Sequence, residues 1–306
     1  MLQLLHGTDF PFMRYRRAAY VLSAVVLAIT LAWLVRQGGP RYSVDFTGGT
    51  LVQFRTSQPV PADQVRTALE QAGLGGVELQ QLTGEDRNEY MLRMKSEQAG
   101  RDVVATVQKA IAERVPGVQV ELRRTEQVGP KVGNELREKA VWAILGSLGG
   151  ILLYVGLRYE FKFALGAVVA LFHDVFVTLG FLVFTNREVS LTVIAALLTI
   201  AGFSINDKVV VFDRIRERSK ALRKEKHSRA MDIAVNETLS RTVITNTTVF
   251  LSAVALLVWG GDVLRDFSFA TVVGILVGPY SSVYLASALA LDIWIWLDRR
   301  KGIPAE

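Results

Sequence analysis

The chain has 306 residues, half of them hydrophobic at 50%, and its mean hydropathy is +0.29. A soluble domain of this length rarely reaches such a mean, so the composition predicts a membrane protein. The lack of cysteine excludes disulfides, thiol catalysis and cysteine metal sites. The net charge of +6 comes largely from segments beside apolar runs. That placement favours contact with membrane lipid over nucleic acid.

Six apolar runs are long enough to cross a bilayer as helices. A signal peptide is the alternative for the first run, because Arg14, Arg16 and Arg17 precede it. That run is too long for a signal peptide and lacks a small-x-small cleavage site, so an uncleaved helix is favoured. We predict an α-helical polytopic membrane protein with six transmembrane helices, at residues 18–36, 139–157, 163–184, 190–212, 241–259 and 267–297.

The positions of lysine and arginine predict the orientation of these spans. The segments rich in these residues all fall on one side of a six-span chain, and short basic segments stay cytoplasmic. The opposite turns, 185–189 and 260–266, hold one arginine each and as many or more acids. Both termini are therefore expected in the cytoplasm, and residues 37–138 outside it. The expected cytoplasmic segments are the tail 1–17, the basic loop 213–240 and the tail 298–306.

Residues 37–138 read as a small αβ domain between the first two spans. Alternating apolar residues predict strands at 50–56, 77–82, 90–94 and 118–122. A helix is predicted over 61–72, and another, capped by Ser96, carries the apolar stripe Val104, Val107 and Ile111. The order β-α-β-β-α-β is that of a ferredoxin-like α+β extracytoplasmic domain.

The fourth span contains Asp207, an acidic residue about 9 Å from its cytoplasmic end at 1.5 Å per residue. Placing a carboxylate in hydrocarbon costs roughly 2.5–3.5 kcal/mol on insertion scales, so such a residue is a candidate functional site. Ser204 lies on the same helical face, three residues earlier, and Asn206 precedes the aspartate.

The fifth span opens with Arg241, which begins a polar stripe continued by Thr245, Thr248 and Ser252. Since spans four and five run in opposite directions, Asp207 and Arg241 approach the same depth and could pair. If a conformational change breaks and remakes this contact, Asp207 can take up and release a proton. A permanent contact would instead be a static lock between two helices. Both interpretations stay open from the residues alone.

Other polar residues in the spans also have two interpretations. His173 and Asp174, near the middle of span three, either hold helices together by hydrogen bonds or belong to a proton path. Lys208 is better explained by snorkelling, or by a cavity open to the cytoplasm, than by transport. Gly146-x3-Gly150 and Gly274-x3-Gly278 predict close helix packing, and Pro279 predicts a kink in span six.

Several catalytic signatures are missing from the sequence. It has no Gly-x4-Gly-Lys-Ser/Thr phosphate loop, no His-Glu-x2-His pair and no Gly-x-Ser-x-Gly elbow. The three histidines, His6, His173 and His227, are scattered. We therefore expect neither an enzyme nor a metal site.

Five ordered motifs resemble those of the SecF family of protein-export membrane proteins. The most specific is Gly202–Glu217, which reads GFSINDKVVVFDRIRE and is similar to the family's fourth-span signature. The others are Val44–Gly49 after span one, Val128–Gly133 before span two, Leu171–Asp174 in span three and Thr238–Thr242 at the start of span five.

The resemblance implies a function that the residues alone do not show. Members of the family pair with SecD, belong with the resistance-nodulation-division transporters and sit in the prokaryotic cytoplasmic (inner) membrane. They associate with the SecYEG channel and often with YajC, and they use the proton-motive force to draw a preprotein across after SecA has driven it in with ATP. By this resemblance Asp207 and Arg241 contribute to the proton path, with His173, Asp174, Ser204, Asn206 and Thr245 as possible supporting residues. No cofactor is implied beyond the proton gradient.

Two other functions remain as alternatives. The chain could be a passive assembly or scaffold subunit of the Sec channel that conducts no protons. It could also be a complete small-molecule exporter of the same superfamily, although six spans with one outer domain amount to half of such an exporter.

Overall fold

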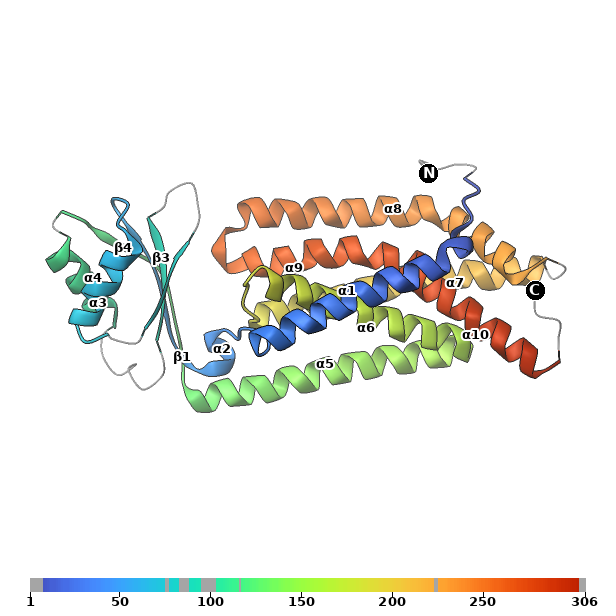
Figure 1. Cartoon of the computed structure of the whole chain (residues 1–306), viewed down its shortest axis with the longest axis horizontal. Helices are drawn as coiled ribbons and strands as arrows, with labels where there is room; N and C mark the ends of the chain where they lie inside the picture. Colours follow the sequence, from blue (N-terminus) through green and yellow to red (C-terminus); the bar gives the residue numbers. More distant parts are fainter. Residues whose placement is uncertain are drawn as a thin grey trace. The chain divides into compact units, whose positions relative to one another are not determined.

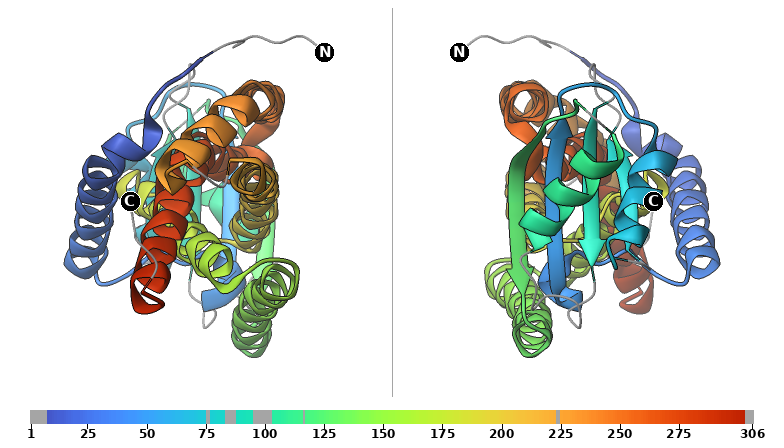
Figure 2. Two further views of the ribbon diagram at one scale, coloured as in Figure 1. Left: turned by 90° about the vertical axis from the view of Figure 1, so that its right-hand side faces the viewer. Right: turned by 90° about the vertical axis from the view of Figure 1, so that its left-hand side faces the viewer.

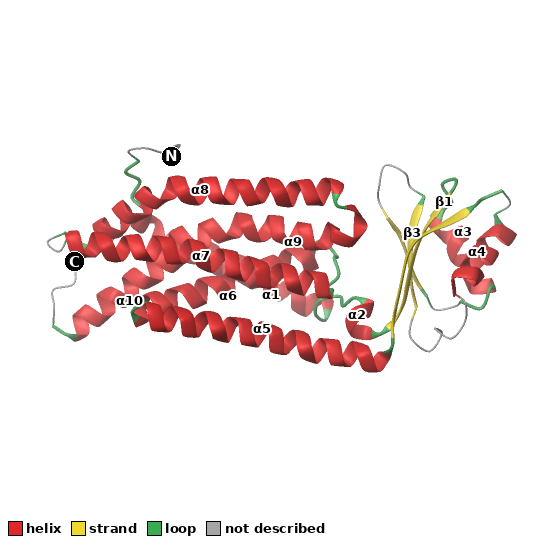
Figure 3. Ribbon diagram, turned by 180° about the vertical axis from the view of Figure 1, so that it is seen from behind, coloured by secondary structure: helices red, strands yellow, loops and turns green. Residues whose placement is uncertain are grey.

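The computed structural model describes residues 8–74, 77–82, 88–94, 103–115, 117–222 and 225–302. The chain divides into two compact units. The first comprises residues 1–41 and 142–306 and is helical where described, whereas the second, residues 42–141, holds the sheet (Figures 1 and 3).

Within the described ranges, six helical segments are long and apolar enough to cross a membrane, and the chain is a multi-pass membrane protein. A short 3₁₀ turn, η1 (Phe12–Tyr15), leads into the first of them. The last span is continuous but consists of three labelled pieces. The spans are α1 (Arg16–Gln37), α5 (Pro130–Arg158), α6 (Phe161–Phe184), α7 (Leu191–Ala221), α8 (His227–Trp259) and α9–η3–α10 (Gly261–Tyr280, Ser281–Ala286, Ser287–Arg300).

The six spans differ in how much of their surface the chain itself covers. α6, α7 and the last span supply most of the buried side chains, whereas few side chains are buried in the apolar stretches of α1, α5 and α8. The small-residue motifs follow this division. A side chain at Gly274 would collide with Ile200 on α7, so this glycine permits close packing. Gly146 and Gly150 on α5 have nothing within 4 Å, so the packing predicted for them is not made by the described residues.

α7 and α8 continue as helices well past the apolar runs. α7 begins at the cap Ser190, whose side chain accepts a hydrogen bond from the Val193 amide, and it ends only at Ala221. Residues 213–240, expected as a basic loop, are therefore largely helical. Glu237 on α8 explains part of this order, because it accepts hydrogen bonds from Arg214 Nε at 2.6 Å and Arg218 Nε at 2.7 Å.

The last span changes its winding in the middle. Pro279 lies near the end of α9, and the next six residues, Ser281–Ala286, form a π-helix. The Ser287 hydroxyl donates to the Ser282 carbonyl, five residues back, at 2.9 Å. Such π turns occur frequently at functional sites.

The second unit is a four-stranded antiparallel sheet in the order β2-β3-β1-β4. Its strands are β1 (Gly49–Thr56), β2 (Glu78–Leu82), β3 (Glu89–Met94) and β4 (Val120–Val128). The helices α3 (Ala62–Gln71) and α4 (Val103–Arg114) cover one face (Figure 2, right), and a core that includes Phe54, Tyr90 and Ile111 fills the space between. This order and connectivity confirm the ferredoxin-like prediction. Ser96, the predicted cap of the second helix, lies outside the described residues.

The two glycine motifs that flank this domain lie against each other. Gly49 at the start of β1 pairs with Val128 at the end of β4. The short helix α2 (Val44–Thr47) ends at Gly48, whose φ of +68° favours glycine. A side chain at Gly133 would lie 3.0 Å from the Gly48 nitrogen, so this close approach favours glycine.

Candidate functional site

Asp207 is buried on α7, with 5% of its surface exposed. Its Oδ2 accepts a hydrogen bond from Asn246 Nδ2 on α8 at 2.6 Å. The same Nδ2 donates to the Thr242 carbonyl, one turn earlier on α8, at 2.8 Å. The carboxylate in span four therefore has an amide on span five as its nearest partner.

Arg241, the predicted partner of Asp207, does not touch it. Of the ion pairs among described residues, none joins Arg241 to Asp207 within 4.0 Å. Arg241 is exposed on α8 and acts on the aspartate only through its electrostatic field, as does Lys208. Because α8 presents Arg241 outward, the permanent lock between these two residues is not present in this conformation.

Lys208, the residue after Asp207, occupies the interior of the bundle. A step of one residue turns the side chain by about 100° around a helix, so the two neighbours face different partners. Lys208 has 0% exposure and its Nζ lies 2.9 Å from Asp174 Oδ2 on α6. The expectation of snorkelling or a cytoplasm-lined cavity is wrong, because the ammonium is enclosed and paired.

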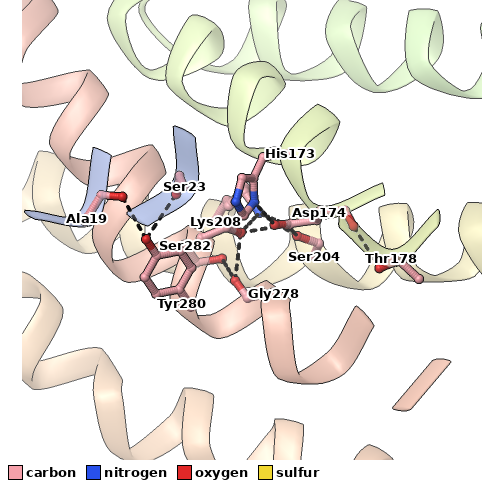
Figure 4. Close-up of polar contacts among 11 residues, drawn as sticks. Ala19, Ser23, His173, Asp174, Thr178, Ser204, Lys208, Gly278, Tyr280 and Ser282 are labelled. Carbon is pink, nitrogen blue, oxygen red and sulfur yellow. Dashed lines mark hydrogen bonds and ion pairs between the residues drawn. The ribbon is translucent and has the colours of Figure 1, made fainter. Parts of the chain in front are cut away.

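Two serine hydroxyls complete this internal pair, and Figure 4 labels one of them, Ser204, beside Asp174 and Lys208. Ser204 and Ser281 donate to Asp174 Oδ2 at 2.5 and 2.6 Å, and Lys208 Nζ donates to Ser281 Oγ at 3.0 Å and to Ser204 Oγ. All three ammonium donors are thus used. Ser281 begins the π turn, so this cluster joins spans three, four and six. We call Asp174, Ser204, Lys208 and Ser281 the internal charge cluster.

His173 adds a contact on the other carboxylate oxygen. Its Nδ1 lies 3.1 Å from Asp174 Oδ1, and its ring is beside that of Tyr280, with centroids 6.1 Å apart. Tyr280 in turn donates to the Ala19 carbonyl of α1 at 2.9 Å (Figure 4). His173 therefore links the internal charge cluster to the first span.

The structure separates the residues that the sequence grouped together. Ser204 belongs with Asp174 rather than with Asp207, and Asn206 is exposed. Thr245 is also exposed, and its hydroxyl donates to the Arg241 carbonyl of its own helix at 3.0 Å. Asn246, one residue on from Thr245, was missed. Its signal was an amide inside an apolar span, on the face next to the stripe that Arg241 begins.

The described residues contain no group of three or more histidine, cysteine, aspartate or glutamate side chains that could hold a metal ion. What the site offers is a buried, hydrogen-bonded carboxylate on α7, an exposed arginine on α8 and a separate internal charge cluster. A carboxylate in this setting is a candidate proton-binding group.

Comparison with known proteins shows which family the chain resembles. The family profile described as "Protein export membrane protein SecD/SecF, C-terminal" matches residues 107–296, and that of the SecD/SecF GG motif matches residues 37–60. The protein translocase subunit SecF of Thermodesulfovibrio yellowstonii is 39% identical over 295 residues, covering 95% of this chain and 97% of that protein. This chain belongs to the SecF family. SecF of Vibrio alginolyticus is 42% identical and covers 96% of this chain and 93% of its own.

Two solved structures share the fold. The crystal structure of SecDF, a translocon-associated membrane protein from a Thermus species, matches with a TM-score of 0.85 and 36% identity. A second SecDF structure, in a super-membrane-facing form, matches with a TM-score of 0.69 and 37% identity. Each comparison covers 98% of this chain but 40% of the SecDF chain, so this SecF chain spans less than half the length of those proteins.

Proposed function

We propose that this SecF chain acts with SecD as an accessory subunit of the Sec translocase and uses the proton-motive force to promote late steps of preprotein translocation. The observation that carries the proposal is Asp207, a carboxylate 5% exposed within a transmembrane helix and held by one amide. An ionisable group is retained there at a cost, which a proton-binding role explains.

Asp207 and Arg241 are the proposed proton-path residues. Asp207 binds the proton, and Arg241, exposed on the neighbouring span, is free of an ion pair to it in this conformation. A partner subunit or a movement of α8 would bring the arginine into or out of contact. Asp174, His173 and Ser204 support the path indirectly through the packing of α6 against α7, whereas Asn206 and Thr245 are exposed on the same two spans as the pair.

The proposed location is the prokaryotic cytoplasmic membrane, with both termini in the cytoplasm and the ferredoxin-like domain outside it. The excess of lysine and arginine at the expected cytoplasmic ends supports this orientation. The proposed partners are SecD, the SecYEG channel, SecA, YajC, the translocating preprotein and membrane lipid. In this role the chain is not an enzyme and uses the proton gradient in place of a cofactor.

Asp207→Asn tests the proposal. Asparagine keeps the volume and most hydrogen bonding but cannot ionise, so the variant should assemble and lose the proton-dependent part of export. Export is measured in membrane vesicles with and without a proton gradient, at constant ATP. Asp213→Asn, which removes an exposed carboxylate on the same helix, is the matched control and should export normally. Normal proton-dependent export by Asp207→Asn would favour the passive scaffold instead.

A further inference from the structure

Asn246 has one half of its amide occupied and the other half unused. Its Nδ2 donates both to Asp207 Oδ2 at 2.6 Å and to the Thr242 carbonyl at 2.8 Å. Its Oδ1 is buried and has no hydrogen-bond partner among the described residues, and the residue as a whole is only 6% exposed. A buried carbonyl oxygen without a donor is unfavourable and calls for an explanation.

The two protonation states of the neighbouring Asp207 carboxyl group explain this unpaired oxygen. An ionised carboxylate only accepts hydrogen bonds, so it requires a donor such as Nδ2. A protonated carboxyl also carries an O–H donor, which requires an acceptor such as Oδ1. An amide is therefore a partner for both states, and the unused oxygen is the group that the protonated state needs.

We propose that Asn246 senses whether Asp207 carries a proton and passes that state to α8. This inference rests on the proposed proton role of Asp207. On protonation, one proton is added to Asp207 and no other bond is made or lost covalently. The new O–H donates to Asn246 Oδ1, and the Nδ2 bond to the carboxylate is given up. On release of the proton, the donor arrangement returns.

The second hydrogen bond of Asn246 Nδ2 couples this change to the backbone of α8. Turning the amide so that Oδ1 meets Asp207 also removes Nδ2 from the Thr242 carbonyl, which lies next to Arg241 in the chain. The charged groups that act on Asp207 are Lys208 and Arg241. Lys208 is held in place by the other members of the internal charge cluster. We therefore expect α8, which carries Arg241, to be the helix that moves when Asp207 changes its charge.

Asn246→Leu tests the inference in export. Leucine is close in size but offers neither donor nor acceptor, so we expect at least a tenfold loss of proton-dependent export with ATP-driven export unchanged. Asn246→Gln keeps both functions and should retain most of the activity. Thr247→Val, an exposed change at the next position of α8, is the matched control and should behave as the parent.

Infrared difference spectroscopy on the unaltered chain provides a second test. If Asn246 had a purely structural role, its amide band would not change when Asp207 takes up a proton. With asparagine side chains labelled by ¹³C, we expect an amide carbonyl band to change at the same pH step as the carboxyl band of Asp207. Both changes should vanish in Asp207→Asn, and the amide change should vanish in Asn246→Leu.

The outcomes separate this inference from the proposed function. Normal proton-dependent export by Asp207→Asn overturns the proposed function. Loss of export in Asp207→Asn, together with normal export in Asn246→Leu or no amide band at the carboxyl step, overturns the role of Asn246 alone.

Discussion

Lys208 Nζ and Asp174 Oδ2 lie 2.9 Å apart, and neither side chain has any exposed surface. The pair joins α6 to α7, and the hydroxyls of Ser204 and Ser281 satisfy the remaining hydrogen-bonding positions around it. A buried ion pair of this kind is weak evidence for net stability, but removing one member leaves an uncompensated charge.

Lys208→Met should therefore destabilise the bundle by roughly 3–5 kcal/mol, the range for a broken buried pair. The uncompensated carboxylate of Asp174 is the physical reason. Unfolding of the purified chain in detergent, followed by tryptophan fluorescence, measures the change.

The double variant Asp174→Asn with Lys208→Met is the control for that prediction. It removes both charges together, so most of the lost stability should return. A double variant as unstable as Lys208→Met would show that packing of the lysine stem, not charge, is what matters.

Arg241→Lys should lower proton-dependent export while leaving the stability of the bundle within about 0.5 kcal/mol, since exposed changes of this kind have small effects. A lysine ammonium does not reproduce the planar, permanently charged guanidinium. Export with and without a proton gradient, beside unfolding of the same preparation, separates the two effects. If the Asp207→Asn, Arg241→Gln double variant exports normally, export does not require proton binding at Asp207.

Gly133→Ala should destabilise the ferredoxin-like domain by about 1–3 kcal/mol, as overpacking does. The added carbon would lie 3.0 Å from the Gly48 nitrogen and 3.3 Å from the Phe46 carbonyl. Faster hydrogen exchange in β1 and β4 would report it. Gly129→Ala is the matched control, because nothing lies within 4 Å of the added carbon there, and equal effects of the two changes would contradict the explanation.

Cross-linking the domain should stall late export and spare its SecA-driven initiation. The chain has no cysteine, so a cysteine placed at an exposed position of β4 such as Thr125 can be joined to one in the outer region of SecD. Release of mature protein outside the vesicle or cell measures the late step, and reduction of the disulfide should restore it. Unchanged release under efficient cross-linking would show that the domain need not move.

The fold could be predicted from the sequence because its signals are local. Runs of about twenty apolar residues identify spans, and alternation identifies the four strands of the domain. The end of α7 at Ala221 was harder to predict from the sequence, because Glu237 stabilises this part of α7 from another helix.

The candidate site was only partly predictable. Asp207 stood out because a charge in an apolar run is costly. The sequence did not show which way each side chain points, since a span is apolar on the lipid side and the inner side alike. The stripe counted from Arg241 therefore followed the exposed face of α8, and the inward Asn246 lay one residue away. The pairing of Lys208 with Asp174, which are 34 residues apart, depends on tertiary packing.

The pairing of Gly49 with Val128 gives the ferredoxin-like domain a particular mechanical character. The chain enters the sheet and leaves it at the same end of two adjacent antiparallel strands. If both connections are displaced together, the load passes into the domain as a whole and its hydrogen bonds are not stretched. If the two connections are drawn apart, the hydrogen bonds between β1 and β4 break one after another, beginning at that end. The domain thus moves as one body when its two connections move together. When they separate, the β1–β4 pairing beside Gly49 and Val128 is the first part to open.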